Sequence, residues 1–184
     1  STGMVLFSTP MSSCTWFEYV LVADVDADGQ AELVAVANSP MVSDISLRAI
    51  ATDLKATIEI LDVLNCCISD AGLEFVGSVA PPRLRAIRFG GTCCLEDDAT
   101  PVGLIGERPV VTNYGVEELL RGVGQSLRVF YFESGSQNGQ AAARLAYAGL
   151  SAEGMAKSLS AHCPFLEVVR IEGLLPRLRQ RVLR

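Results

Sequence analysis

The sequence predicts an α/β fold: a curved solenoid of about five or six irregular repeats, with parallel strands on its concave face and helices on its convex face. A fixed period is the first observation behind this prediction. Ala31–Val36 aligns with Ile58–Val63 at a spacing of 27 residues, and Val42–Leu47 aligns with Ile68–Leu73 at a spacing of 26. The second observation is a helix-start signal, Ser-Asp, at the same place in both units. Each repeat is therefore expected to be a strand, a tight turn and a helix.

The repeats follow one another along a single expected domain, residues 1–184. Residues 1–30 are an atypical N-terminal unit, in which Met4–Phe7 indicates a strand and about Thr15–Ala23 a helix. The fourth unit begins its helix late, at Gly115–Gly122, so that residues 90–114 are expected to be a loop insertion. Residues 174–184 form a basic C-terminal cap. The strands of the regular units are expected to begin at Ala31, Ile58, Leu84, Leu127 and Leu166.

Two stretches carry a pattern that resembles the leucine-rich repeat family. In its cysteine-containing, ribonuclease-inhibitor-like subtype, a strand L-x-x-L-x-L-x-x-C precedes a segment like I-T-D-x-G-L and a helix that ends near C-P. Residues 58–77, IEILDVLNCCISDAGLEFVG, and residues 150–171, LSAEGMAKSLSAHCPFLEVVRI, match it. The resemblance covers residues 31–173 and implies a protein-binding surface, as in substrate-recognising subunits of ubiquitin ligases. Other residues replace the pattern's cysteine at Ser39, Thr92, Gly135 and Leu174.

Alternation along each strand places its third, fifth and seventh residues opposite the apolar core. The outward positions are apolar in the N-terminal half, and they combine Tyr and Arg with acids in the C-terminal half. Exposed apolar surface and Tyr or Arg side chains are typical of protein-binding surfaces. We therefore expect a non-enzymatic scaffold or adaptor, including a subunit of a larger assembly, unless the insertion or the tail covers this face. The expected partner-binding residues are Leu33, Ile60, Asp62, Leu64, Arg88, Tyr131, Glu133, Arg170 and Glu172.

An alternative hypothesis is a calcium site formed by Asp24, Asp26 and Asp28 before Gly29, together with Glu32. Three alternating carboxylates before a glycine turn have the spacing to wrap a calcium ion. An EF-hand, however, needs a bidentate acid at its twelfth position, which is Ala35 here, and a β-propeller needs many such loops. The competing interpretation is a solvated loop between a helix and a strand.

Metal and catalytic chemistry find little support elsewhere. The two Cys-Cys pairs lie 27 residues apart, which is the repeat period, and they lack the C-x2-C spacing of a zinc site. The six cysteines are therefore expected to be buried free thiols in a reducing compartment. His162 is the only histidine, at an expected helix end, so the sequence offers no catalytic triad without it. We expect no enzymatic activity and no cofactor.

Charge and hydropathy narrow the classes of partner. The net charge of −6 argues against general affinity for nucleic acid, although Arg177, Arg179, Arg181 and Arg184 leave RNA binding by the tail as a third hypothesis. No apolar run reaches the roughly 18 residues that a membrane helix needs. The expectation is an intracellular, cytoplasmic protein with a protein partner.

Overall fold

Seven strands form one sheet in the described part of the computed structural model, and their order in the sheet is their order in the chain. The structure describes residues 4–11, 18–24, 27, 29–37, 42–91, 110–134, 147 and 149–173. Strands β1 (Met4–Met11), β2 (Glu18–Asp24) and β3 (Leu33–Ala37) pair antiparallel. From β3 to β7 every pairing is parallel.

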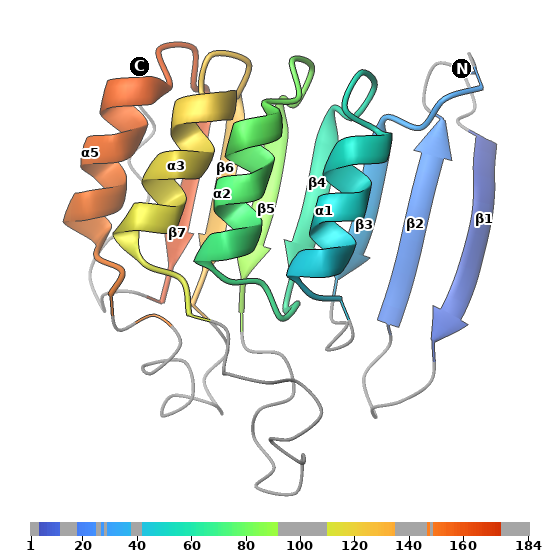
Figure 1. Cartoon of the computed structure of the whole chain (residues 1–184), viewed down its shortest axis with the longest axis horizontal. Helices are drawn as coiled ribbons and strands as arrows, with labels where there is room; N and C mark the ends of the chain where they lie inside the picture. The colour runs from blue at the N-terminus through green and yellow to red at the C-terminus, as the bar shows by residue number, and fades with distance from the viewer. Residues whose placement is uncertain are drawn as a thin grey trace, which may run out of the picture.

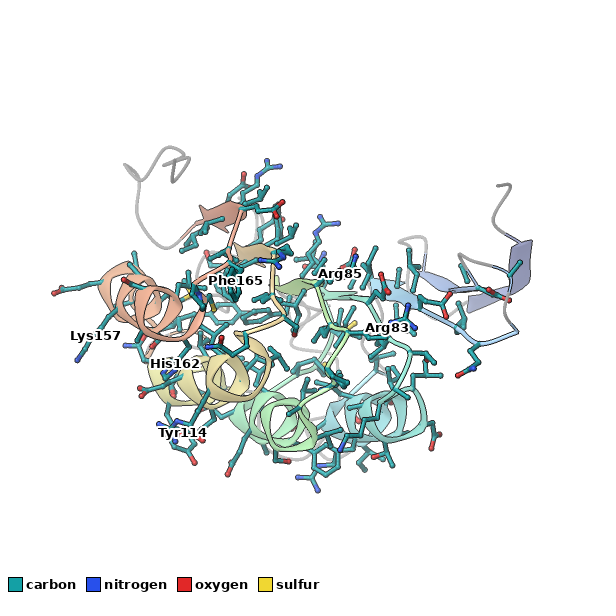
Figure 2. All side chains as sticks on the ribbon, turned by 90° about the horizontal axis from the view of Figure 1, so that it is seen from above. Arg83, Arg85, Tyr114, Lys157, His162 and Phe165 are labelled. Atoms are coloured by element: carbon teal, nitrogen blue, oxygen red, sulfur yellow. The ribbon has the colours of Figure 1, made fainter. Side chains whose placement is uncertain are left out.

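Helices alternate with the parallel strands, and all the described helices cover the same face of the sheet (Figure 1). Seen from above, the strands follow a shallow arc with the helices along its outer side (Figure 2). The prediction of an α/β fold with a mostly parallel sheet is confirmed. The elements after β3 are α1 (Asp44–Asp53), β4 (Ile60–Leu64), α2 (Asp70–Val79), β5 (Ala86–Gly90), α3 (Asn113–Val123), β6 (Val129–Glu133), α5 (Ala152–His162) and β7 (Val168–Glu172).

The prediction of a helix at about Thr15–Ala23 is wrong for residues 18–23, the part of this stretch that the structure describes. Residues 18–23 belong to β2, which pairs with β1 on one side and with β3 on the other. The run Tyr19–Ala23 is apolar throughout and contains two valines, and β-branched residues favour the extended backbone of a strand. In consequence, the acidic stretch that begins at Asp24 joins two antiparallel strands, and the expected helix-to-strand loop is wrong as well.

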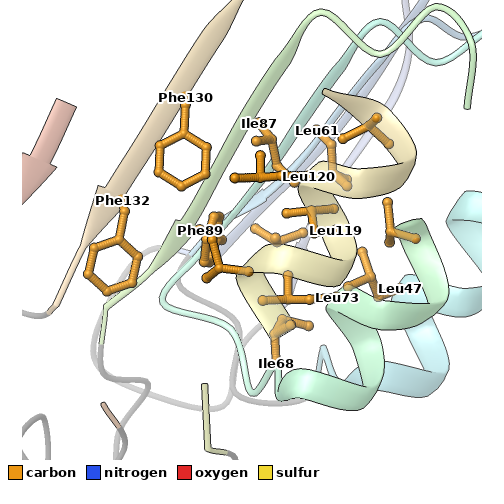
Figure 3. Packing of buried hydrophobic residues seen from close by; sticks show 14 of the residues in the cluster. Leu47, Leu61, Ile68, Leu73, Ile87, Phe89, Leu119, Leu120, Phe130 and Phe132 are labelled. Carbon is orange, nitrogen blue, oxygen red and sulfur yellow. The ribbon is translucent and has the colours of Figure 1, made fainter. Parts of the chain in front are cut away.

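The core lies between the sheet and the helices, where residues of alternate strand positions meet leucines of the helices (Figure 3). Ile87 and Phe89 of β5 are 2% and 1% exposed, whereas Arg88 between them faces the other side of the sheet and is half-buried. Phe89 meets Phe130 and Phe132 edge to face, at ring-centre distances of 5.5 and 5.4 Å. Such aromatic pairs contribute about 0.5–1.5 kcal/mol beyond the burial of apolar area. The inward positions expected at Leu84, Ile87 and Phe89 are confirmed.

Neighbouring helices are joined at their N-termini by side-chain hydrogen bonds. The Asp44 carboxylate at the start of α1 accepts the Ser69 backbone N–H at 2.8 Å and also the Ser69 hydroxyl. At the start of α2, Asp70 accepts the Thr112 backbone N–H at 2.8 Å and the Thr112 hydroxyl at 2.7 Å. Ser69 and Thr112 are themselves the N-caps of α2 and α3. Each acid therefore holds the cap of the following helix.

Asn113 continues the same arrangement from α3 to α5. Its Oδ1 accepts the Ser151 N–H at 3.0 Å, and its Nδ2 donates to Ser151 Oγ at 3.2 Å. Hydrogen bonds to charged groups contribute about 1.5–3 kcal/mol each, roughly twice as much as neutral ones, so the two aspartate steps are the stronger ones. We call this set of bonds the cap ladder; its members are Asp44, Ser69, Asp70, Thr112, Asn113 and Ser151.

Glycine stands three residues after each cap of the ladder because a side chain there would meet the preceding ladder residue. A Cβ added at Gly72 would lie 2.3 Å from Asp44 Oδ1, and one at Gly115 would lie 2.1 Å from Asp70 Oδ1. In α1, the same helix position is Ser46, and no described helix precedes it to supply an acid. The glycine is thus required by the ladder and not by the helix.

Gly72→Ala is expected to lower the free energy of unfolding by about 1–3 kcal/mol because the new Cβ overlaps the Asp44 carboxylate. Helix propensity alone predicts the opposite sign, since Ala is favoured over Gly in a helix by about 1 kcal/mol. Urea unfolding of Gly72→Ala, Asp44→Ala and the double variant measures the coupling. We expect the double variant to lose less than the sum of the single losses, because without the carboxylate the Cβ has space.

Ser46→Ala is the matched control, since it changes the equivalent residue of α1 without a carboxylate above it. Its loss is expected to stay within about 1 kcal/mol, the usual value of a single neutral hydrogen bond. A gain of stability in Gly72→Ala, or strictly additive losses in the double variant, would contradict the ladder as the reason for the glycine.

Candidate functional site

One face of the sheet carries none of the described helices, and we call it the helix-free face in that sense. It presents three rows of residues, each set by the strand register. The start row joins register partners near the beginnings of the strands: Leu33, Ile60, Ala86, Val129 and Val168. The middle row lies two residues further along: Ala35, Asp62, Arg88, Tyr131 and Arg170. The end row follows after two more: Leu64, Gly90, Glu133 and Glu172.

In the middle row, the Tyr131 ring lies between two arginines. The Arg88 guanidinium carbon is 4.7 Å from the ring centre, and that of Arg170 is 5.1 Å from it. Because Arg88 and Arg170 are the register partners of Tyr131 in β5 and β7, the cations reach the ring from opposite sides. At exposed sites, each cation–π contact contributes about 0.5–1 kcal/mol. We call this arrangement the Arg-Tyr-Arg stack.

Carboxylates on the same face accept hydrogen bonds from all three side chains of the stack. Arg88 donates through NH1 to Asp62 Oδ2 at 3.2 Å, and Arg170 donates through Nε to Glu172 Oε1 at 2.5 Å. The Tyr131 hydroxyl donates to Glu133 Oε2 at 3.1 Å and lies 3.4 Å from Glu172 Oε2. Arg88 Nε is buried and has no hydrogen-bond acceptor among the described residues. Six polar side chains from four strands thus form one connected network.

Burial raises the pKa of the Tyr131 hydroxyl above its ordinary value of 10.0. The hydrogen bond to Glu133 and the negative charges of Glu133 and Glu172 raise it further, while the positive charge of Arg170 acts in the opposite direction. The hydroxyl is therefore protonated at neutral pH and acts as a hydrogen-bond donor. This state matches the two acceptor carboxylates beside it.

Apolar side chains of the start row lie beside the stack. Ile60 is 39% exposed and Val168 is 51% exposed. A shallow groove of about 390 Å³ runs between this row and the middle row. One of its sides is aliphatic, and its other side presents guanidinium groups and a phenol. The groove is lined mainly by Ile60, Ala86, Val129, Arg88, Tyr131 and Arg170.

Most of the residues expected to bind a partner meet on this face. Six of them, Asp62, Arg88, Tyr131, Glu133, Arg170 and Glu172, form the network of the stack. Leu33 and Ile60 are register partners in the start row. Leu64 occupies its expected row but is only 6% exposed, at the last position of β4 directly before the turn at Asn65. It therefore offers little surface to a partner.

Val129 and Val168 belong to the same accessible row as Ile60, although the expected set did not include them. The alternation that places Tyr131 and Arg170 on this face also places these two valines there, two residues earlier in each strand. Both valines are therefore predicted as outward residues, whereas the expected partner-binding set on these two strands contains only the aromatic and charged side chains.

The residues of the calcium hypothesis are described only in part. Asp24 and Glu32 are each 3% exposed, and Asp24 Oδ2 accepts the Gly29 N–H at 2.8 Å within the loop between β2 and β3. Asp26 and Asp28 lie outside the described residues. Within the described ranges, no three His, Cys, Asp or Glu side chains gather closely enough to hold a metal ion.

The described cysteines are buried free thiols. The Cys66 thiol donates to the Val36 carbonyl at 2.6 Å, which ties the end of β4 to β3. Burial raises the pKa of the Cys163 thiol to about 11, so this thiol is a poor nucleophile at neutral pH. His162 is the last residue of α5, as expected. Cys14, Cys93, Cys94 and the arginines after residue 173 lie outside the described residues.

Comparisons with known proteins identify no relative of this chain, so a function has to be inferred from the fold and from the geometry of this face. No protein-family model matches the sequence, and no curated protein matches it. Among the described helices, none combines the length and the apolar character that crossing a membrane requires.

Replacing Tyr131 by Phe is expected to remove a pH dependence of stability at high pH. Above about pH 10, the folded protein holds the hydroxyl proton more tightly than the unfolded chain does, because folding raises the pKa of Tyr131. The free energy of unfolding of the wild type therefore falls as pH rises through that range. Tyr131→Phe keeps the ring between the arginines but has no such proton.

Urea unfolding of the two proteins at about pH 8, pH 9.5 and pH 10.5 tests this. We expect the stability advantage of the wild type over Tyr131→Phe to shrink as the pH rises. An advantage that stays constant across these pH values would show that the hydroxyl is not held as described.

Proposed function

We propose that this chain is a leucine-rich-repeat solenoid of the cysteine-containing subtype and that it acts as a non-enzymatic scaffold, binding a protein partner on its helix-free face. The repeat assignment is supported by five parallel strands in chain order and by the burial of the pattern positions. Ile58, Leu61, Val63 and Cys66 are between 0% and 7% exposed. Cys163 ends the motif of the last unit and is also buried.

The Arg-Tyr-Arg stack is the observation that carries the proposed binding role. Tyr and Arg are the side chains most often responsible for binding energy in protein interfaces. Here they are held in place by Asp62, Glu133 and Glu172, so that a partner does not have to order them. The aliphatic row at Ile60 and Val168 lies next to them and supplies apolar area to bury.

The state of the charged groups also supports binding over catalysis. The carboxylates of the face are engaged with Arg88, Tyr131 and Arg170, and the tyrosine hydroxyl is protonated at neutral pH. General acid–base chemistry needs a group that exchanges a proton near the working pH. Such a closed network of ions and hydrogen bonds is better suited to shape and charge recognition. The buried Arg88 Nε, which has no acceptor among the described residues, adds a donor that a partner is able to satisfy after a small rotation of the side chain.

The double variant Arg88→Glu/Arg170→Glu is expected to lose partner binding, because it reverses both charges of the stack and places two new acids beside Asp62, Glu133 and Glu172. Loss of two interface arginines costs about 2 kcal/mol or more, which lowers affinity by about thirtyfold or more. The measurement is affinity capture from native lysate, with quantitative mass spectrometry of the proteins retained by the wild type and by the variant.

Lys55→Glu/Lys157→Glu is the matched control, since it makes the same change of net charge at two exposed lysines away from this face. The proteins of interest are those that the control retains and the stack variant loses, with circular dichroism unchanged in both. If the stack variant retains every protein that the control retains, the helix-free face is not the binding surface.

A further inference from the structure

A second and larger hollow lies at the edge of the sheet where the parallel strands start. Its volume is about 820 Å³, and it lies between the end of α2, the end of α3 and the residues directly before β5 and β6. Among the described residues, its lining contains three arginines, Arg83, Arg85 and Arg128, and one carboxylate, Glu167. Figure 2 looks onto this edge and shows Arg83 and Arg85 on it. The hollow is thus positive in a chain whose net charge is −6.

Arg83 is fully engaged by a neighbouring acid, and Arg85 is not. Arg83 donates to Glu59 Oε1 from both Nε, at 3.0 Å, and NH2, at 2.6 Å. The one ion pair of Arg85 among the described residues is with the other oxygen of Glu59, at 3.9 Å, and its side chain is 64% exposed. One carboxylate therefore balances two guanidinium groups, and the excess charge belongs to Arg85.

Arg128 is held in place by an uncharged group. Its NH1 donates to the Phe165 carbonyl at 2.9 Å, and its guanidinium lies 4.8 Å from the centre of the Phe165 ring. Its ion pair with Glu167 is long, at 3.9 Å, and that carboxylate is 71% exposed. The Arg128 backbone N–H donates to the Arg85 carbonyl at 2.7 Å, so the two arginines lie side by side on neighbouring strands. Arg85 and Arg128 thus present two guanidinium groups side by side, and the ion pair that each forms with a glutamate is long, at 3.9 Å.

Part of this positive charge serves the fold, because helix C-termini attract cations. The last turn of α3 has its own basic residue, Arg121, whereas the last turn of α2 has none. Arg83 follows the end of α2 closely and supplies a positive charge near that helix C-terminus. Arg85 and Arg128 directly precede β5 and β6, and neither helix end requires them. Their charge remains for a ligand.

We propose that this hollow binds an acidic peptide segment, whose carboxylates pair with Arg85 and Arg128. Guanidinium groups match carboxylates with paired hydrogen bonds, and the exposed Pro82 offers an apolar contact for the aliphatic part of a glutamate side chain. A hollow of about 820 Å³ has space for several side chains and is too large for one phosphate group. The net charge of −6 repels a long nucleic acid, whereas a short acidic segment responds to the local charge.

The test uses fluorescein-labelled hexaglutamate and the whole chain, with binding followed by fluorescence anisotropy. We expect saturable binding at low ionic strength that weakens as salt is added, because exposed ion pairs are screened. Arg85→Glu/Arg128→Glu is expected to weaken binding by about tenfold or more, while Lys55→Glu/Lys157→Glu changes it by less than about twofold. If Arg85→Glu/Arg128→Glu unfolds less cooperatively than the wild type, the test uses Arg85→Gln/Arg128→Gln instead. Glutamine removes the positive charge without adding an acid.

Three results would overturn the proposal. The first is no saturable binding of hexaglutamate by the wild type at low salt. The second is an equal loss of binding in the arginine variants and in the lysine control, which would indicate attraction to overall charge alone. The third is tighter binding of a labelled thymidine hexanucleotide than of hexaglutamate, which would show that the hollow prefers phosphates.

Discussion

The structure depends on the hydrogen bonds by which each helix holds the N-cap of the next. Asp44 and Asp70 each accept both the backbone N–H and the hydroxyl of a cap one unit away, so neighbouring helices start at matched heights. Where the connection is short, as between Leu64 at the end of β4 and Asp70 at the start of α2, a helix fixed at its start also fixes the end of the strand before it. The ladder and the backbone bonds of the sheet therefore support the same register, and neither allows one unit to slide past another.

That register produces the chemistry of the helix-free face. Neighbouring strands lie about 4.8 Å apart. The arginine-to-ring distances of 4.7 and 5.1 Å in the Arg-Tyr-Arg stack equal this spacing within a few tenths of an ångström. A planar ring and a planar guanidinium in the same row therefore stack without any adjustment of the backbone. A shift of one residue in one strand would turn Tyr131 into the core and bring Phe130 or Phe132 to the face.

Much of this fold could be predicted from the repeat period, since alternation fixes which strand residues face the helices. The stretch from Ile58 to Gly77 identifies the inward positions, and Ser69-Asp70 identifies a helix start. It does not reveal that Asp70 reaches the start of the following helix, because Thr112 lies 42 residues further along the chain, within the expected insertion. The strand expected at Met4–Phe7 lies within β1, whereas β2 was missed because Tyr19–Ala23 is a short, wholly apolar run, which lacks the alternation that separates strand from helix.

The two proposed binding surfaces come from the same three-residue step along the strands. Arg85 precedes Arg88 by three residues, Arg128 precedes Tyr131 by three, and Glu167 precedes Arg170 by three. Three residues of extended chain span about 10 Å, so the hollow at the strand starts and the stack on the face are neighbours. The start row, with its exposed Ile60 and Val168, lies between them. A partner that places apolar side chains over this row therefore has charged groups within reach on both sides: mostly arginines at the strand starts, and arginine with acids on the face.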